Sequence, residues 1–166
     1  MKILFIQTGG TIDKEYEQGV EAYNFVITSP SIARILDQSK PSFEYRILPV
    51  TKKDSMDLTD ADRESIVAAC IQAAEDRIII THGTDTMAQT AKALSHIAGK
   101  VIVLTGALRP ERFYNSDAMF NVGTAVGGVQ TLKNGVYIAM SGQLFPWDQY
   151  HKHPTTGQFI NRQAQT

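Results

Sequence analysis

Two short turns in this chain bring threonine hydroxyls and glycines together. The first reads Thr8-Gly9-Gly10-Thr11, the second reads Thr81-His82-Gly83-Thr84-Asp85-Thr86, and each follows a run of apolar residues. Glycines let a ligand approach the backbone, while hydroxyl and backbone N–H groups can hold a carboxylate or stabilise an oxyanion. A threonine hydroxyl also becomes a nucleophile when a base and an oxyanion site lie beside it. The two turns therefore indicate a site for a small polar substrate.

Each turn also has an ordinary structural explanation. Threonine and aspartate cap helices, and glycine-rich turns follow strands in many α/β domains. Taken alone, Thr11 would more often cap a turn, and Asp85 could cap the helix that follows it. The presence of two turns of similar design in one chain favours the catalytic interpretation.

A nucleotide-binding interpretation fails on detail. The first turn continues as Gly9-Gly10-Thr11-Ile12 into a long polar stretch, whereas a dinucleotide-binding turn reads G-x-G-x-x-G and opens a helix. The chain also lacks the G-x-x-x-x-G-K-[ST] segment that cradles a triphosphate. We therefore expect no nucleotide, and no other cofactor, at this site.

Five apolar runs predict the strands that must position these turns. The central runs do not alternate, which is typical of parallel strands covered on both faces. Helical patterns fill most of the gaps: one begins at Ser29-Pro30, one at Thr59, and two span about 86–97 and 116–132. The sequence thus predicts an α/β fold with a three-layer parallel sheet, Rossmann-like or flavodoxin-like. The expected strands are residues 3–7, 43–50, 77–81, 100–105 and 136–140.

Polar residues follow every predicted strand. In an open parallel sheet the ligand binds beyond the carboxyl ends of the strands, so these residues are expected to share one edge. Thr84-Asp85-Thr86 also begins the third predicted helix, where free N–H groups favour an anionic group. Besides the two threonine turns, the segments at this edge are Thr51-Lys52-Lys53-Asp54-Ser55, Thr105-Gly106-Ala107 and Ser141-Gly142-Gln143.

Composition narrows the class of protein. The chain has 166 residues and a formal net charge of -1, with no basic block that would indicate binding to nucleic acid or to an anionic membrane. We expect one domain over residues 1–166, with a lid loop or hairpin at 12–27 and an irregular tail at 141–166. Cys70 is the only cysteine and is expected to be inert core. A reducing, cytoplasmic location follows, and His151 with His153 is too small a set to predict a metal site.

At these residues the chain resembles the bacterial L-asparaginase family, also called asparaginase/glutaminase. The resemblance rests on residues 8–12 and 81–87 and covers nearly the whole chain, in a short single-domain form similar to the N-terminal domain of longer enzymes. It implies an amidohydrolase that converts L-asparagine to L-aspartate and ammonia through a threonine acyl-enzyme. Supporting matches are Asp54-Ser55-Met56 and Gly106-Ala107-Leu108-Arg109-Pro110, followed by Asp117, Phe120 and Asn121.

The resemblance also implies catalytic roles. Thr11 matches the nucleophile, and Thr84 matches a second hydroxyl. Asp85 and Lys152 match the partners that handle the proton, although the residues around Lys152 match poorly and it could be a solvated surface charge. His82 is expected to hold a turn by hydrogen bonds.

Substrate-binding residues follow in the same way. Ser55 matches a residue that holds the substrate's α-carboxylate, with Asp54 beside it and with Met56 where a polar residue is usual. Backbone N–H groups near Gly10 or Gly83 are the expected oxyanion donors. Among the tyrosines of the expected lid, Tyr23 matches the lid tyrosine best and Tyr16 is a weaker candidate.

One departure from the family matters. Family members usually continue into a second, smaller domain, which helps a neighbouring subunit to bind the α-amino group of the substrate, and residues 1–166 are expected to act without such a part. A homodimer or higher homo-oligomer is therefore expected to close the site. Two alternatives stay open: a non-catalytic amino-acid-binding module on the same fold, in which Lys152 is displaced and Asp85 only caps a helix, and an amidase that prefers glutamine or another carboxamide.

Overall fold

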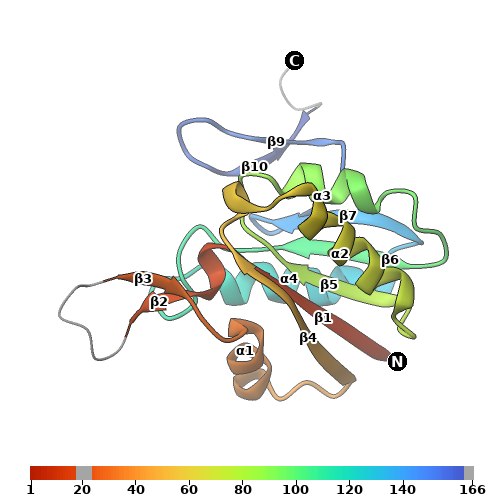
Figure 1. Cartoon of the computed structure of the whole chain (residues 1–166), viewed down its shortest axis with the longest axis horizontal. Helices are drawn as coiled ribbons and strands as arrows, with labels where there is room; N and C mark the ends of the chain where they lie inside the picture. The colour runs from red at the N-terminus through yellow and green to blue at the C-terminus, as the bar shows by residue number, and fades with distance from the viewer. Residues whose placement is uncertain (18–23, 163–166) are drawn as a thin grey trace.

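A six-stranded sheet forms the centre of the computed structural model, which describes residues 1–17 and 24–162 (Figure 1). Five strands run parallel in the order β4-β1-β5-β6-β7, and β8 adds an antiparallel edge. Numbered along the chain, the parallel strands have the order 2-1-3-4-5, which is the flavodoxin-like arrangement. The strands are β1 (Lys2–Gly9), β4 (Glu44–Lys53), β5 (Arg77–Thr81), β6 (Val101–Thr105), β7 (Gly135–Met140) and β8 (Gln143–Pro146).

Helices cover both faces of this sheet and complete three layers. On one face, α2 (Asp60–Gln72) and α3 (Met87–Leu94) pack against side chains such as Ile78 and Leu104. On the other face, α1 (Ser31–Ser39) and α4 (Ala118–Thr131) pack against Phe5 and Val103. The predicted fold class is therefore confirmed, and the central strands are buried on both sides as expected. Within the described residues, no helix is long and apolar enough to cross a membrane.

The two connections that follow β5 have opposite hands. The chain moves in one direction along the sheet from β5 to β6 and from β6 to β7, yet α3 and α4 lie on opposite faces. Crossovers between parallel strands are right-handed in about 98% of proteins, so one of these is an exception. As a result, the segment between β6 and α4 passes over the α1 face, where the N–H of Glu111 donates to the carbonyl of Ile12. The exceptional connection thus supports the turn that follows β1.

Two predicted helix starts had different outcomes. Thr59 is the N-cap of α2 and forms a capping box with Asp62, as expected. Ser29 does not cap α1, because that helix begins at Ser31 with Pro30 at its N-cap and without a side-chain cap from its own flank. Asp13, distant in sequence, accepts from the Ser31 N–H instead. Local pattern could not reveal a cap supplied by tertiary contact.

The segment expected to be a loop or hairpin after β1 is a hairpin in its described parts. It starts with a 3₁₀ turn, η1 (Thr11–Asp13), and continues as β2 (Lys14–Tyr16) paired antiparallel with β3 (Phe25–Ile27). Figure 1 shows this hairpin projecting from the body of the protein. The tyrosine expected in the lid, Tyr23, lies outside the described residues.

The expectation of an irregular tail was wrong. After β8, the chain forms β9 (Tyr150–Lys152) and β10 (Phe159–Asn161), which pair antiparallel beside α3 (Figure 1). Phe145 and Phe159 are buried, and the rings of Tyr150 and Phe159 stack with centroids 5.1 Å apart. Strands of three residues are too short to show a period, so only contact with the rest of the molecule defines them.

Candidate active site

The two threonine turns meet at the switch point of the sheet. From β1 the chain passes to β4 on one side, and from β5 it passes to β6 on the other, so the ends of β1 and β5 flank a crevice where ligands bind in such folds. Gly10 has φ +85°, and a Cβ placed on it would lie 2.4 Å from the Cα of Gly83. The turns therefore abut backbone to backbone. Thr11 and Thr84, which follow these glycines, are both half-buried.

Most threonine hydroxyls at this edge have structural partners. Those of Thr8, Thr51, Thr81, Thr86 and Thr105 each donate to a backbone carbonyl of a neighbouring segment. Thr84 differs, because its Oγ1 accepts from the ammonium of Lys152 at 3.0 Å. Thr11 makes no side-chain hydrogen bond within residues 1–17 and 24–162. The two hydroxyls expected to react are thus the ones that the fold leaves out of its backbone contacts.

Lys152 joins the second hydroxyl to a carboxylate. Its Nζ lies 2.7 Å from Oδ1 of Asp85 as well as 3.0 Å from Oγ1 of Thr84. Asp85 does not cap α3: the N-cap is Thr86, and the carboxylate turns to the lysine. The expectation that the β9 residue Lys152 reaches this turn agrees with the geometry, and a purely solvated lysine does not. Side-chain exposure is 32% for Lys152 and 53% for Asp85, so in the single chain the pair still faces solvent.

A pocket of about 510 Å³ opens on the outer side of this group. Thr84, Asp85 and Lys152 line it together with side chains of α3 and of the tail, including Lys92 and Trp147. Thr11 and Ser55 are not among its lining residues. The predicted site residues therefore do not all surround this one pocket.

Ser55 lies against the glycine of the second turn. Its side chain is buried against Gly83, where an added Cβ would lie 2.7 Å from the Ser55 Oγ. This Oγ has no hydrogen-bond partner among the described residues. A buried hydroxyl without a partner costs free energy, and a ligand oxygen at this position would remove the cost.

The neighbours of Ser55 have different surroundings. Asp54 pairs with Lys14 at 2.5 Å, and this ammonium lowers the pKa of the carboxyl. The ion pair links the base of the β2–β3 hairpin to the Ser55 turn. Met56, which was expected to contact substrate, is 69% exposed.

His82 anchors the second turn from below. It is fully buried, and its Nδ1 donates to the Gly83 carbonyl at 2.7 Å while its Nε2 accepts from the Thr90 hydroxyl at 2.8 Å. The roles of the two nitrogens follow from the carbonyl, which can only accept. Burial lowers the pKa of this imidazole to about 4, so it is neutral at pH 7. The expected role as a turn-holding residue agrees with these contacts.

The remaining polar predictions are structural. Tyr16, the weaker lid candidate, is half exposed and packs edge-on against Phe25 with centroids 4.8 Å apart. Cys70 is buried in the α2 core, which raises its pKa to about 12. Within the described part of the chain, no group of three or more His, Cys, Asp or Glu side chains could hold a metal ion.

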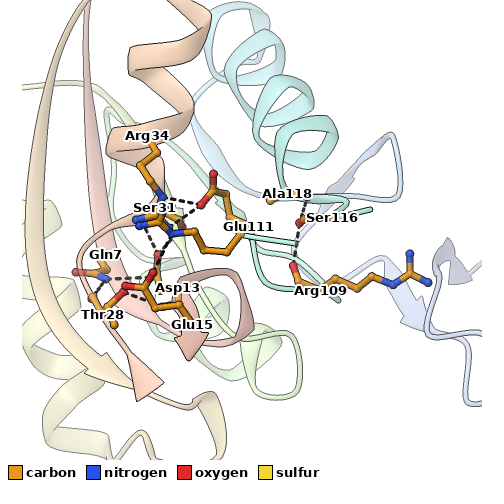
Figure 2. Close-up of polar contacts among 11 residues, drawn as sticks. Gln7, Asp13, Glu15, Thr28, Ser31, Arg34, Arg109, Glu111, Ser116 and Ala118 are labelled. Carbon is orange, nitrogen blue, oxygen red and sulfur yellow. Dashed lines mark hydrogen bonds and ion pairs between the residues drawn. The ribbon is translucent and has the colours of Figure 1, made fainter. Parts of the chain in front are cut away.

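Sequence reasoning missed the residues that support the first turn. Asp13, in η1, is buried and accepts hydrogen bonds from Gln7 and Ser31 (Figure 2). Glu111 lies close to the same turn and pairs with Arg34 at 2.6 Å. The one signal in the sequence was an acidic residue two positions after Thr11, close behind the apolar run of the first strand.

Sequence comparison matches most of the chain to a known protein family. The family model described as "Asparaginase, N-terminal" matches residues 2–158. L-asparaginase from Thermococcus kodakarensis is 33% identical over 150 residues, which are 87% of this chain and 45% of that protein. A glutamyl-tRNA(Gln) amidotransferase subunit from Aeropyrum pernix is 33% identical over 136 residues, 75% of this chain and 31% of that protein.

Solved structures agree in the same way. The thermostable L-asparaginase from Thermococcus kodakarensis has a TM-score of 0.83 at 29% identity, covering 97% of this chain and 51% of that one. L-asparaginase I from Vibrio cholerae has a TM-score of 0.79 at 26% identity, covering 96% and 51%. The chain spans about half the length of these relatives, or less. With both threonine turns in place within the matched region, it belongs to the asparaginase family through that family's N-terminal domain.

Proposed function

We propose that this chain hydrolyses a side-chain carboxamide, with L-asparagine as the expected substrate, and that Thr11 is the nucleophile. The observation that carries the proposal is the position of the Lys152 ammonium. It contacts Thr84 at 3.0 Å and Asp85 at 2.7 Å, in a turn whose glycine abuts the turn that carries Thr11. A hydroxyl needs a base nearby to lose its proton in the transition state, and the Lys152 side chain is such a base when it is uncharged.

The proposed reaction has two steps. The Oγ of Thr11 bonds to the amide carbon while its proton passes, by way of the Thr84 hydroxyl, to the amine of Lys152, which acts in its uncharged form and is held by Asp85. The carbon–nitrogen bond then breaks, the leaving nitrogen takes up a proton, and ammonia departs from an ester on Thr11. In the second step water cleaves this ester, which releases the carboxylic acid and restores the hydroxyl. Backbone N–H groups of the two turns would stabilise the oxyanion in both steps.

Ser55 is the proposed contact for the substrate's α-carboxylate. Its buried Oγ lacks a partner among the described residues, and a carboxylate oxygen would accept a hydrogen bond from this hydroxyl. Glutamine is longer than asparagine by one methylene, which a pocket discriminates by only about 10- to 200-fold. Glutamine therefore belongs in the same assay.

Two alternatives differ in their support. A non-catalytic binding module requires a displaced Lys152 and an Asp85 that only caps a helix, and neither premise matches the contacts above. The relatives named as glutamyl-tRNA(Gln) amidotransferase subunits favour another candidate, in which this chain acts within a protein complex. The net charge of -1 without a basic block argues against direct contact with tRNA.

We also propose that a second copy of the chain covers the site. Asp85 and Lys152 retain 53% and 32% exposure, and a cover that excludes water would strengthen their interaction. A monomer in sedimentation, at a concentration where the protein is active, would contradict this. A cytoplasmic location is proposed because the lone Cys70 is a buried thiol that has no disulfide partner in the chain.

The test measures ammonia release from asparagine and glutamine. Activity is expected in the wild type, and Thr11→Ala should lower kcat by at least about 10³-fold because the covalent step is lost. Thr124→Ala is the matched control, since Thr124 only bonds the Phe120 carbonyl within α4. A folded wild type that turns over neither amide, nor any related carboxamide, would refute the proposal.

A further inference from the structure

The turn that carries Thr11 is attached to a buried carboxylate. Asp13, the last residue of η1, is 1% exposed. Three donors converge on it: the Ser31 N–H at 2.8 Å, the Ser31 hydroxyl at 2.5 Å and the Gln7 amide at 3.1 Å (Figure 2). These donors come from β1 and from the first residue of α1. The carboxylate therefore joins the sheet, the first helix and the turn at one point.

Backbone hydrogen bonds from three other segments also fix this turn. The N–H of Gly10 donates to the carbonyl of Lys53 at 2.9 Å, and the carbonyl of Ile12 accepts from Glu111 at 3.2 Å. The carbonyl of Asp13 accepts from Thr28 at 3.1 Å. Thr11 is thus flanked by fixed neighbours, while its own hydroxyl makes no bond within the described residues.

This arrangement is expensive for the fold. Burial raises the pKa of the Asp13 carboxyl, and the bonds from Ser31 and Gln7, with the positive charge of Arg34, oppose that effect. Gln7 uses its amide nitrogen for Asp13 and for the Thr28 carbonyl, which leaves its own buried oxygen without a partner among the described residues. Replacement of a whole buried ion pair or triad by well-packed apolar side chains is often neutral or stabilising. The free-energy cost of burying Asp13 and the Gln7 oxygen is explained if the geometry of the Thr11 turn has to be fixed.

We propose that Asp13 is a positioning residue for the nucleophile, holding η1 so that the Thr11 hydroxyl faces the second turn. Asp13 touches no reacting atom and acts only through the backbone it fixes. The inference rests on the proposed function, in which Thr11 attacks the amide.

Kinetics of two Asp13 variants provide the first test. Asp13→Ala removes all three acceptor contacts and should lower kcat by about 10²-fold, with KM within about threefold, because small misplacements of a reacting group have effects of this size. Asp13→Asn retains an oxygen for both Ser31 donors and should recover most of that loss. Asp37→Asn, at an exposed position on α1, is the control and should match the wild type.

Asp13→Ala and Asp13→Asn are expected to change the stability of the protein as well, so kcat is measured per folded molecule. If Asp13→Ala does not fold, Asp13→Asn and Ser31→Ala decide. Ser31→Ala deletes the 2.5 Å bond while leaving the carboxylate, and kcat should fall by about tenfold. Folded variants with wild-type kcat would overturn the proposal, since a purely structural residue changes the melting temperature and not the turnover.

A second readout does not depend on turnover. In protein with ¹³C-labelled threonine methyls, the Thr11 signal, assigned with Thr11→Ser, should shift or broaden in Asp13→Ala, while that of Thr124 stays in place. An unchanged Thr11 signal in the folded variant would overturn the positioning role. A wild type without amidase activity, but with a Thr11 signal that responds to Asp13, would reject the proposed function and retain the positioning of the turn.

Discussion

Single residues at this site carry costs that the fold alone does not explain. Ser55 has a buried hydroxyl without a partner among the described residues, and Gln7 has an amide oxygen in the same condition. Asp13 keeps a carboxylate out of water. Buried polar groups are normally paired, so the Ser55 hydroxyl and the Gln7 amide oxygen, which lack partners, point to a ligand or to a geometric requirement.

Ser55 is predicted to show opposite effects on stability and on binding. Ser55→Ala removes a desolvated hydroxyl, so the free energy of unfolding should stay the same or rise by about 1 kcal/mol. The KM for asparagine should rise by about 10- to 100-fold, because a hydrogen bond to a charged oxygen is lost. Urea denaturation and steady-state kinetics measure the two effects.

Ser65→Ala serves as the control for this pair of measurements. Ser65 is exposed on α2 and bonds only the Ala61 carbonyl. The Ser65→Ala substitution should leave the KM for asparagine unchanged. A Ser55→Ala protein with the wild-type KM would show that the substrate does not use this hydroxyl.

At the scale of elements, the contact between the two turns depends on glycine at both positions. A Cβ on Gly10 would meet the Gly83 backbone at 2.4 Å, and one on Gly83 would meet the Ser55 side chain at 2.7 Å. Backbone atoms cannot give way as the end of a flexible side chain can. The threonine that follows each glycine is therefore placed by a direct backbone contact.

Gly10→Ala is predicted to lower the free energy of unfolding by more than the left-handed backbone of residue 10 alone would explain. Gly99 is the comparison, because it has φ +76° and open space around its Cβ position, whereas Gly10 has φ +85° and the Gly83 backbone. Gly99→Ala should destabilise by about 1–2 kcal/mol, the cost of a left-handed backbone for a residue with a side chain. Gly10→Ala should lose more and should abolish activity. Equal melting temperatures for the two variants would contradict the close contact of the turns.

At the scale of the whole molecule, the buried His82 links folding to pH. Its pKa in the folded protein is about 4, below its ordinary value of 6.5. Between these values the unfolded chain binds a proton that the folded chain does not. Its contribution to stability is therefore fully present above pH 6.5 and is lost as the pH falls towards 4, by about 3 kcal/mol in total. Asp13, whose pKa is raised above its ordinary value of 3.8 by burial, opposes this trend, because the folded protein then binds a proton more readily than the unfolded chain.

His82→Gln should flatten this part of the stability profile, because glutamine can donate to Gly83 and accept from Thr90 without binding a proton. Chemical denaturation at several pH values between 4 and 7 would measure the difference. His96→Gln, at an exposed position, should retain the wild-type slope. Parallel profiles for His82→Gln and the wild type would show that His82 is not the group responsible.

Glycines in α4 show where local rules and packing separate. Gly123, Gly127 and Gly128 either interrupt a helix or mark close packing, and sequence could not choose between these. The helix is continuous from Ala118 to Thr131, and only at Gly128 would a Cβ meet a neighbour, Leu144, at 2.6 Å. Close packing at Gly128 is due to β8, which carries Leu144. The sequence of this edge strand shows no hydrophobic period, so the contact could not be predicted.

Residue types and the order of neighbouring residues were enough to predict the fold class, the two threonine turns and one helix cap. Unbroken apolar runs require strands covered on both faces, and the glycine–threonine turns that end two of them indicate the family and supply the candidate reacting groups. Thr59 could be identified as a cap from sequence, and in the structure its capping-box partner, Asp62, is only three residues away. All of these signals lie within a few residues of the feature they predict.

Tertiary structure alone decided what brings distant segments together. The cap of α1 comes from Asp13 and not from Ser29, and the support of η1 comes from Glu111, on a segment placed there by a crossover of exceptional hand. The strands that carry Lys152 to Thr84 form only against the body of the protein. Hydrogen bonds between residues far apart in the chain leave no periodic trace in the sequence, because their spacing is set by the path of the whole fold.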